Sequence, residues 1–306
     1  MNNTEHILIT GGTGFIGQYL MPVLLQQGHQ VSVLGRDANK IRRLFGNTVT
    51  AVTQLSEIQR PVNTIINLAG ASIGESRWSA ANKQRFVDSR IHTTQTLLAW
   101  VKQQEQRPQR IINGSAIGYY GTDASLQWQQ VCDETYPPQP EFVSQLCLQW
   151  EQVADEFEAL NLQVVKLRLG LVMGKGAMAF DAMLKPIRYG KIGTIGSGRQ
   201  PVVWIHIDDV VAVVCWLLQQ PIWHHSVYNL VAPQITSQAD FARTAAKVLK
   251  TQAPLRMPAR LLRLVLGEQS DLILNGQKVV PKYLLEQGFQ FQYTDLKQAL
   301  QQLLRS

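Results

Sequence analysis

The sequence of 306 residues contains only three cysteines, Cys132, Cys147 and Cys215. Their number is odd and they lie far apart, so they fit neither a disulfide framework nor the ligand spacing of a zinc site. His224 and His225 are adjacent, but they lack cysteine or carboxylate partners at ligand spacing, and we expect no metal site. A reducing environment suits this cysteine usage, so we expect a cytoplasmic protein.

Long apolar runs and concentrated charge are also missing. No window approaches the ~18 uninterrupted apolar residues of a membrane span. Residues 1–5 lack the basic and apolar regions of a signal peptide, so we expect neither secretion nor a membrane partner. The formal net charge is +7, but lysine and arginine are scattered and no basic run is interleaved with aromatic residues. We therefore expect a small-molecule substrate and no nucleic-acid partner.

Strand-like and helix-like segments alternate over the first two thirds of the chain. This alternation predicts an α/β fold, a doubly wound parallel sheet of Rossmann type with helices on both faces. The expected strands are residues 6–10, 30–34, 49–52, 64–68, 110–113 and 164–167, and the expected helices are residues 15–27, 39–45, 80–105, 143–160 and 210–219.

The last third of the chain has a different pattern. Residues 170–200 are rich in glycine and contain Pro186, which predicts a loop with short helices. Helices are expected at residues 237–249, 259–266, 281–286 and 294–304. We therefore predict a Rossmann domain of residues 1–169 and about 202–233, and a smaller, mostly helical substrate domain of residues 170–201 and 234–306.

Residues 7–17 contain the strongest motif, an apolar run followed by glycines at positions 11, 14 and 17. Such a strand, tight turn and helix start bind the pyrophosphate of a dinucleotide. Gly11 permits the turn, Gly14 lets the backbone approach the phosphates, and Gly17 allows close packing of the helix. The expected cofactor contacts from this motif are Gly11, Thr13, Gly14, Phe15, Ile16 and Gly17.

The end of the second expected strand bears on the choice of dinucleotide. An NAD site usually has an acid at this strand tip, and an NADP site replaces it with a cation. The sequence there is Gly35-Arg36-Asp37, with further basic residues just beyond. We therefore predict NADP(H), with Arg36 at the 2′-phosphate. The alternatives are that Arg36 faces solvent and that Asp37 accepts the ribose of NAD.

These motifs resemble those of the extended short-chain dehydrogenase/reductase superfamily. The likeness lies in residues 10–17, Asn67-Leu68-Ala69-Gly70, Ser115-Ala-Ile-Gly-Tyr-Tyr-Gly121 and Trp204-Ile-His-Ile-Asp-Asp209. The chain further resembles the YfcH-type "epimerase family protein" group, which is similar to nucleoside-diphosphate-sugar epimerases. That likeness covers nearly the whole chain and lies in Trp78, Trp150-Glu151, residues 196–200, Gly267-Glu268 and residues 288–291. It implies a Rossmann fold and NADP binding, with Leu68, Ala69 and Gly70 as further cofactor contacts.

The catalytic device of the superfamily is missing. In related enzymes a Tyr-x-x-x-Lys pair on one helix passes a proton to or from the substrate oxygen. Alignment on Glu151 places Val143 and Cys147 at those two positions, and a shift by one residue places Phe142 and Leu146 there. Neither register gives an acid–base pair, and we expect Cys147 to be a core residue.

Other residues are therefore candidates for the chemistry. Ser115 matches the catalytic serine of the superfamily and is predicted to hydrogen-bond a substrate carbonyl, although it could instead satisfy local backbone groups. Tyr119 and Tyr120 could supply a phenol, or could pack against the neighbouring loop. Arg90 aligns with an active-site asparagine of the superfamily and could bind a cofactor phosphate, or could be an ordinary surface arginine.

Two further residues are candidates for binding the substrate. Arg199 could hold an acidic or phosphorylated substrate, or could be a structural arginine between the domains. His206 could act as a general acid, although its alternation with apolar residues favours a structural role.

Two functions remain open from the sequence. The first is an NADP(H)-dependent oxidoreductase, a reductase rather than an epimerase. The second is a non-enzymatic NADP(H)-binding protein that regulates a partner or senses redox state.

Overall fold

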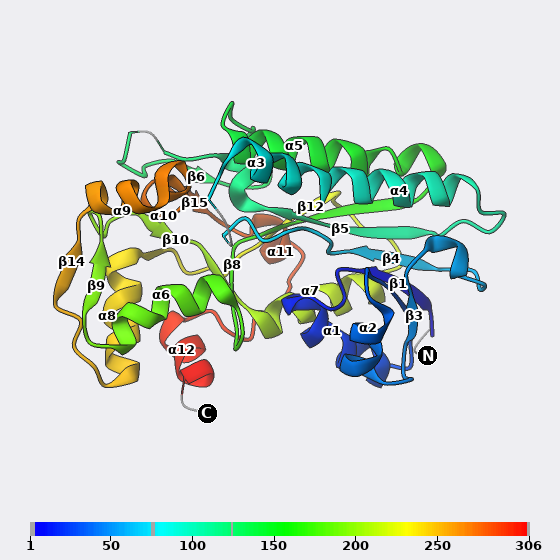
Figure 1. Cartoon of the computed structure of the whole chain (residues 1–306), viewed down its shortest axis with the longest axis horizontal. Helices are drawn as coiled ribbons and strands as arrows, with labels where there is room; N and C mark the ends of the chain where they lie inside the picture. Colours follow the sequence, from blue (N-terminus) through cyan, green and yellow to red (C-terminus); the bar gives the residue numbers. More distant parts are fainter. Residues whose placement is uncertain (1–3, 75–76, 124, 305–306) are drawn as a thin grey trace.

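A computed structural model describes residues 4–74, 77–123 and 125–304 (Figure 1). The predicted α/β fold is confirmed. A parallel, seven-stranded sheet has the order β12-β7-β5-β4-β1-β2-β3, the arrangement of a doubly wound Rossmann fold. Its strands are β1 His6–Thr10, β2 Gln30–Leu34, β3 Thr50–Val52, β4 Thr64–Asn67, β5 Arg110–Ala116, β7 Gln163–Leu169 and β12 Val227–Leu230.

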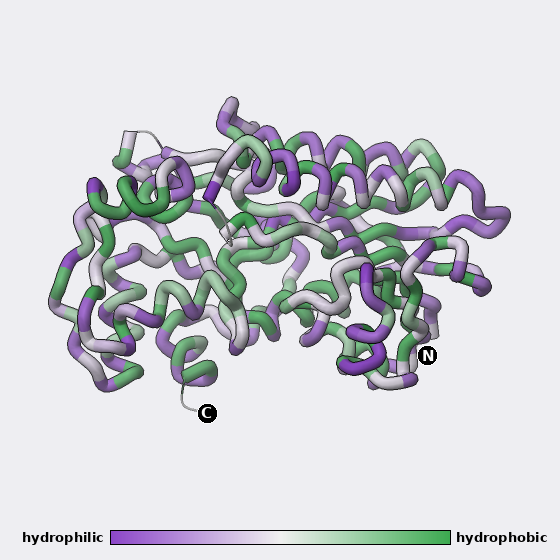
Figure 2. The backbone as a smooth tube through the Cα atoms, viewed as in Figure 1, coloured by the Kyte–Doolittle hydropathy of each residue, from purple (hydrophilic) through white to green (hydrophobic). Residues whose placement is uncertain are grey.

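Helices cover both faces of this sheet (Figure 1). One face carries α3 Ala80–Asp88, α4 Ile91–Lys102 and α5 Phe142–Asp155, and the other carries α1 Phe15–Gln26, α2 Ala38–Phe45 and α7 Ile207–Gln219. The outer sides of α4 and α5 are largely hydrophilic (Figure 2). Short 3-10 helices lie at η1 Leu55–Glu57, η2 Ile117–Tyr120 and η3 Glu158–Leu160.

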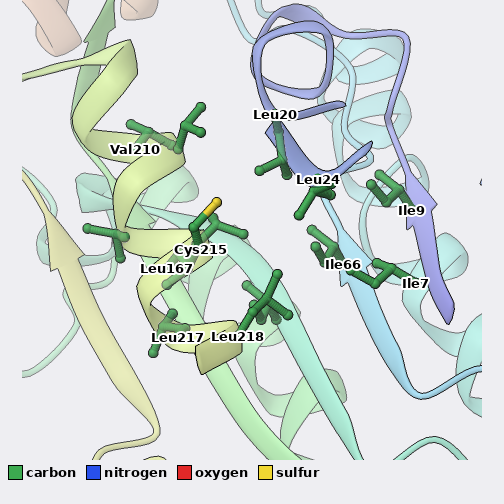
Figure 3. Packing of buried hydrophobic residues seen from close by; sticks show 14 of the residues in the cluster. Ile7, Ile9, Leu20, Leu24, Ile66, Leu167, Val210, Cys215, Leu217 and Leu218 are labelled. Carbon is green, nitrogen blue, oxygen red and sulfur yellow. The ribbon is translucent and has the colours of Figure 1, made fainter. Parts of the chain in front are cut away.

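The central strands are apolar on both sides because both faces of the sheet are covered. Ile7 and Ile9 pack with Leu20 and Leu24 of α1 and with α7, as Figure 3 shows. Leu8, between them in sequence, belongs to the core on the opposite face, beneath α4 and α5. This alternation follows from the two-residue period of a strand.

The remaining elements build a second lobe beyond the carboxyl ends of the strands (Figure 1). It has a core of its own around Phe180, Leu184, Trp204, Phe241 and Leu300. Its helices are α6 Met178–Arg188, α8 Gln238–Leu249, α9 Ala259–Leu266, η4 Gly267–Ser270, α10 Asp271–Leu274 and α12 Leu296–Leu304. Helix α11 Lys282–Glu286 packs instead beside β12 of the Rossmann sheet. Its strand pairs are β10 Pro201–Val202 with β13 Thr236–Ser237, β11 Trp204–His206 with β8 Leu171–Met173, β14 Leu255–Met257 with β9 Ile192–Ile195, and β15 Lys278–Val279 with β6 Val131–Cys132.

Three local expectations were wrong. The single helix expected over residues 80–105 is two helices, because the Arg90 guanidinium donates to the carbonyls of Phe86 and Ala71 and turns the chain where α4 begins. Helix α6 continues through Pro186, which lies in its last turns, where only one intrahelical bond is lost. Strand β12 was not expected, and it forms the sheet edge beside β7.

Candidate dinucleotide site and active site

The turn after β1 has a shape that requires glycine. Gly11 has a φ of +71°, and a Cβ on it would lie 2.5 Å from the carbonyl oxygen of Leu68. The N–H of Gly14 closes the turn by donating to the Gly11 carbonyl at 2.9 Å. A Cβ on Gly17 would lie 2.4 Å from the carbonyl oxygen of Gly12, so α1 begins tightly against the turn. The close packing expected of Gly17 is therefore a contact with the turn backbone.

The N-terminus of α1 fits an anionic group. Gly14 is the N-cap residue, and no side chain caps it; no acid lies in the first turn of the helix. A Cβ on Gly14 would meet only the Gly11 carbonyl oxygen, at 3.0 Å, so the space beside Gly14 is otherwise open. Free N–H groups and the helix dipole both favour phosphate at such a position. The residues present thus fit the pyrophosphate of a dinucleotide.

The other members of the motif contribute through the backbone. The ring of Phe15 packs against Gly174, in the loop after β8, and lies edge-on to Tyr19 at 5.3 Å between centroids. Ile16 packs against the main core. The carbonyl of Thr13 accepts a bond from the Gln18 side chain at 3.0 Å. The side chains of Phe15 and Ile16 thus fix the turn in place.

At the tip of β2, the two residues that bear on the choice of dinucleotide, Arg36 and Asp37, have different environments. Asp37 is the N-cap of α2, and its Oδ1 accepts a bond from the N–H of Lys40 at 3.0 Å. Arg36 is exposed, and no ion-pair partner for it occurs among the described residues. The carboxylate is therefore engaged by the helix, while the guanidinium remains available.

Arg90 lies at the end of β4 and is not an ordinary surface arginine. Its guanidinium carbon would lie 3.0 Å from a Cβ on Gly70, and it stacks on Trp150 at 5.3 Å from the ring centroid. Burial lowers the pKa of Arg90. Within the described ranges no carboxylate pairs with it. The loop of Leu68, Ala69 and Gly70 therefore lies between the glycine turn and a cation without an acidic partner.

Ser115 lies at the carboxyl end of β5 and is part of a buried ionic network. Its hydroxyl donates to Oε1 of Glu151, on α5, at 2.6 Å. Arg168, on β7, holds the same carboxylate in a bidentate pair with bonds of 2.8 and 2.7 Å. All three residues are at most 4% exposed. The sequence reasoning missed Arg168, although a cation inside a buried parallel strand was the available signal.

The two tyrosines have different environments. The Tyr120 hydroxyl accepts a bond from Arg168 at 2.9 Å and donates to Asn229 at 2.7 Å, and the residue is fully buried. Burial raises the pKa of Tyr120 far above its usual range. The expectation that Tyr120 takes part in catalysis was wrong, because its phenol is enclosed in the core.

Tyr119 is half-buried, and its ring stacks on Arg168 with the guanidinium carbon 3.4 Å from the centroid. Burial raises the pKa of Tyr119, and this effect outweighs the opposing charge of Arg168. Its phenol is therefore protonated at neutral pH and, unlike that of Tyr120, is not fully buried.

Val143 and Cys147 face the end of β5, where the superfamily places its catalytic pair. A Cβ on Gly118 would lie 2.5 Å from Cγ1 of Val143 and 3.7 Å from the Cys147 sulfur. Burial raises the pKa of the Cys147 thiol to about 12. Cys147 is thus a core residue, and neither side chain can exchange a proton at neutral pH.

His206 was expected to bind substrate, and the geometry contradicts this. The residue is fully buried and caps α7, with Nδ1 accepting a bond from the N–H of Asp208 at 3.1 Å. Its Nε2 is bonded to Gln302 at 3.0 Å, and the ring stacks on Tyr293. Both ring nitrogens are engaged in structural bonds.

Arg199 is exposed, and its guanidinium carbon lies 5.9 Å from the ring centroid of Trp128. Arg199 forms no ion pair within the described part of the chain, so it does not bridge the lobes through an acid.

The site thus gathers the residues that follow β1, β4 and β5, as ligand sites of open α/β sheets do. A cavity of about 760 Å³ lies instead at the amino ends of the strands, beside Gln109, Arg110 and Gln163. We place the site at the carboxyl ends because the glycine turn and Ser115 lie there. Among the described residues no cluster of histidine, cysteine and acidic residues could hold a metal ion, and no helix is long and apolar enough to cross a membrane.

A parallel Rossmann sheet with a glycine-rich turn after β1 defines the class of nucleotide-binding α/β proteins. The family model of the NAD dependent epimerase/dehydratase family matches residues 7–230, and the chain belongs to that family. A second family model, a domain of unknown function called DUF1731, matches residues 257–303. The predicted resemblance to epimerase family proteins is confirmed.

Individual relatives span the whole chain. Epimerase family protein YfhF of Bacillus subtilis is 35% identical over 306 residues, with 98% of each chain covered. The crystal structure of human epimerase family protein SDR39U1 (isoform 2) with NADPH has a TM-score of 0.87 and 31% identity, covering 98% of this chain and 99% of that one. The structure of Thermus thermophilus UDP-glucose 4-epimerase, at 16% identity and a TM-score of 0.77, shares the fold.

Proposed function

We propose that the protein binds NADP(H) and is a reductase of small carbonyl compounds. The observation that carries the choice of cofactor is the tip of β2. Asp37 is bound to the N-terminus of α2, whereas Arg36 is exposed and free of an acidic partner among the described residues. The human relative whose structure contains NADPH supports the same cofactor.

The residues proposed to hold the cofactor follow from their positions. The N–H groups at the start of α1, in the turn of Gly11, Thr13, Gly14, Phe15, Ile16 and Gly17, would hold the pyrophosphate. Arg36 would bind the 2′-phosphate, and Leu68, Ala69, Gly70 and Arg90 would line the adjoining strand end. When bound, NADP(H) supplies the hydride donor or acceptor.

The direction of the reaction follows from the protonation of the site. A carbonyl reductase needs a hydrogen-bond donor, whereas an epimerase needs a tuned base. Tyr119 retains its proton at neutral pH, and the raised pKa of Cys147 removes it as a base. We assign Tyr119 as the donor to the substrate oxygen. The Ser115 hydroxyl donates its hydrogen bond to Glu151, so only its lone pairs remain for a ligand, which it would orient as a hydrogen-bond acceptor.

The cofactor assignment is tested with Arg36→Ser. Loss of the charged contact is expected to weaken NADPH binding by roughly 10- to 100-fold and to leave NADH binding unchanged. Quenching or enhancement of nucleotide fluorescence measures both. Arg107→Ser is the control, since Arg107 is an exposed arginine just before the amino end of β5, whereas Arg36 follows the carboxyl end of β2. Equal loss for both nucleotides, or no loss, would contradict the assignment.

The chemistry is tested with Tyr119→Phe on a panel of aldehydes and ketones, followed by NADPH absorbance. We expect kcat to fall by roughly 100-fold or more, while the NADPH dissociation constant stays the same. The absence of any consumption by the unaltered protein would favour the second candidate, a non-enzymatic NADP(H)-binding protein. The apolar Val143 and the buried Cys147 at the positions of the usual dyad support that alternative.

A further inference from the structure

Three loops meet beyond the carboxyl end of β5. They are residues 121–123 and 125–128 after η2, residues 196–200 after β9, and residues 275–277 after α10, whose last residue is Leu274. The N–H of Asp123 donates to the carbonyl of Asn275 at 2.9 Å, which joins the first loop to the third. Leu274 lies against Gly196, and this contact brings in the second loop. The junction adjoins the active site, since the Gln277 side chain donates to the Tyr120 carbonyl at 3.4 Å.

The conformation and burial of Trp128 at this junction are energetically unfavourable. The residue is 3% exposed and has a φ of +49°, a left-handed conformation that bulky residues avoid. Its N–H donates to Asp123 at 2.6 Å, which fixes this conformation. Its indole N–H is buried without an acceptor among the described residues. An unmet buried donor costs about 1–3 kcal/mol, so a ligand that accepts this bond would recover part of that cost.

Two arginines lie beside the junction. Arg199 lies next to the indole, is exposed and forms no ion pair in the described part of the chain. Arg256 donates to the Gly196 carbonyl at the base of the same loop. Neither acid of the junction pairs with Arg199: Asp123 accepts the N–H of Trp128, and Asp271 accepts the side chain of Asn275 and lies 3.9 Å from Arg263.

A buried acceptor completes the junction. Oδ1 of Asn275 has no hydrogen-bond partner among the described residues, while its amide nitrogen donates to Asp271 at 2.9 Å. Two donors and one acceptor without partners therefore lie around the same three loops. Arginine and an indole N–H suit the oxygens of a carboxylate or phosphate, and the asparagine oxygen suits a hydroxyl.

We propose that Arg199 and Trp128 form a subsite for the anionic group of the substrate, and that Asn275 accepts a bond from a hydroxyl nearby. This inference rests on the proposed reductase function and names the class of its substrate: small carbonyl compounds that carry a carboxylate or a phosphate. The anionic group binds beyond η2, while the carbonyl end lies toward Ser115 and Tyr119.

Binding is measured on the NADP⁺-loaded protein, in which no hydride is available to reduce the carbonyl probes, through the indole ¹H–¹⁵N resonances of its tryptophans. Trp128→Phe identifies the resonance of Trp128, and the other six tryptophans serve as internal references. The probes form matched pairs: glyoxylate against glycolaldehyde for the carboxylate, and glyceraldehyde 3-phosphate against glyceraldehyde for the phosphate. We expect the anionic member of at least one pair to shift the Trp128 resonance, with a dissociation constant at least 10-fold lower than that of its neutral partner.

Arg199→Gln is the decisive variant, because its side chain is exposed and its loss leaves the core intact. It should weaken binding of the anionic probe by at least 10-fold, whereas Arg107→Gln should leave it unchanged. A response to one pair alone identifies the anion as carboxylate or phosphate. Equal binding of charged and neutral probes, or no effect of Arg199→Gln, would overturn the proposal. Because NADPH binding is measured separately by its fluorescence, failure of the subsite is distinguishable from failure of the cofactor assignment.

Discussion

Arg168 joins more of the active-site region than any single side chain described above. Its guanidinium binds both oxygens of Glu151, donates to the Tyr120 hydroxyl and lies under the Tyr119 ring. The surrounding side chains are buried, so water cannot replace these bonds. The position of Tyr119 at the strand end therefore depends on a residue of the next strand, β7.

Replacing Arg168 by leucine should lower the free energy of unfolding by about 3–5 kcal/mol, because Glu151 would be left as an unpaired buried charge. Adding Glu151→Leu should restore part of that loss, since both charges are then removed. Urea unfolding at pH 7.5 measures the three proteins. The control is Arg243→Leu, whose pair with Asp240 is exposed (72% and 53%) and should contribute less than about 1 kcal/mol. If the two substitutions changed the free energy of unfolding additively in the double variant, the pairing of Arg168 with Glu151 would be contradicted.

At the scale of single residues, the roles of the glycines could be predicted from the sequence better than the roles of the polar residues. The requirement for Gly17 is local, since its close contact is with Gly12 of the same turn, and the positive φ of Gly11 is also set by the turn. The contact of Gly11 with Leu68, at the end of β4, is not local. The difference between Tyr119 and Tyr120 is not local, because it depends on Arg168 and on Asn229 of β12. Neighbouring tyrosines with the same local sequence could not be separated without knowing which strand lies beside them.

At the scale of elements, α7 begins with an unusual cap. His206 fills the position that serine, threonine or aspartate commonly occupies, and its Nδ1 accepts the bond of the first turn. An acceptor at Nδ1 requires a neutral ring with its proton on Nε2, facing Gln302. Burial lowers the pKa of His206, which keeps the ring neutral.

The direction in which stability changes with pH follows from the lowered pKa of His206. Below about pH 6.5, the reference value, the unfolded chain binds a proton at this histidine while the folded chain does not, so stability falls as the pH falls. We expect the free energy of unfolding to be lower at pH 5.5 than at pH 7.5. His206→Asn, which retains a capping oxygen, should reduce that difference. Urea unfolding at both pH values tests it, with the exposed His92→Asn as the control that leaves the difference unchanged.

The boundaries of an element were predictable where a single hydrophobic periodicity defined the whole element. The helix expected at residues 259–266 is α9, and the strands expected at residues 6–10 and 30–34 are β1 and β2. The break between α3 and α4 was not predictable, because the apolar pattern continues and the chain turns through bonds from Arg90 to a distant loop. Strand β12 has only four residues and owes its existence to pairing with β7.

At the scale of the whole molecule, the C-terminal part is interwoven with the Rossmann core. Leu284 and Phe289 pack into the cluster formed by α1, α7 and the central strands. Strand β15 pairs with β6, which follows η2. Arg77, in the loop after β4, donates to the carbonyl of Val265 at 2.8 Å. The general α/β architecture was predictable from alternation, but this interweaving was not, because it joins segments that lie far apart in the sequence.

We therefore expect the chain to unfold as one cooperative unit. Leu300→Ala, at a fully buried position in the core of the second lobe, should cost about 2–5 kcal/mol and lower the unfolding midpoints of both lobes together. Far-UV circular dichroism reports the helices of both lobes. The change in NADPH fluorescence when the nucleotide is released reports the glycine turn in the first lobe. The control is Leu264→Ala on α9, where the side chain is 77% exposed and the midpoints should stay unchanged. Cooperativity would be disproved if Leu300→Ala shifted the dichroism midpoint while NADPH release kept its original midpoint, since the two lobes would then unfold independently.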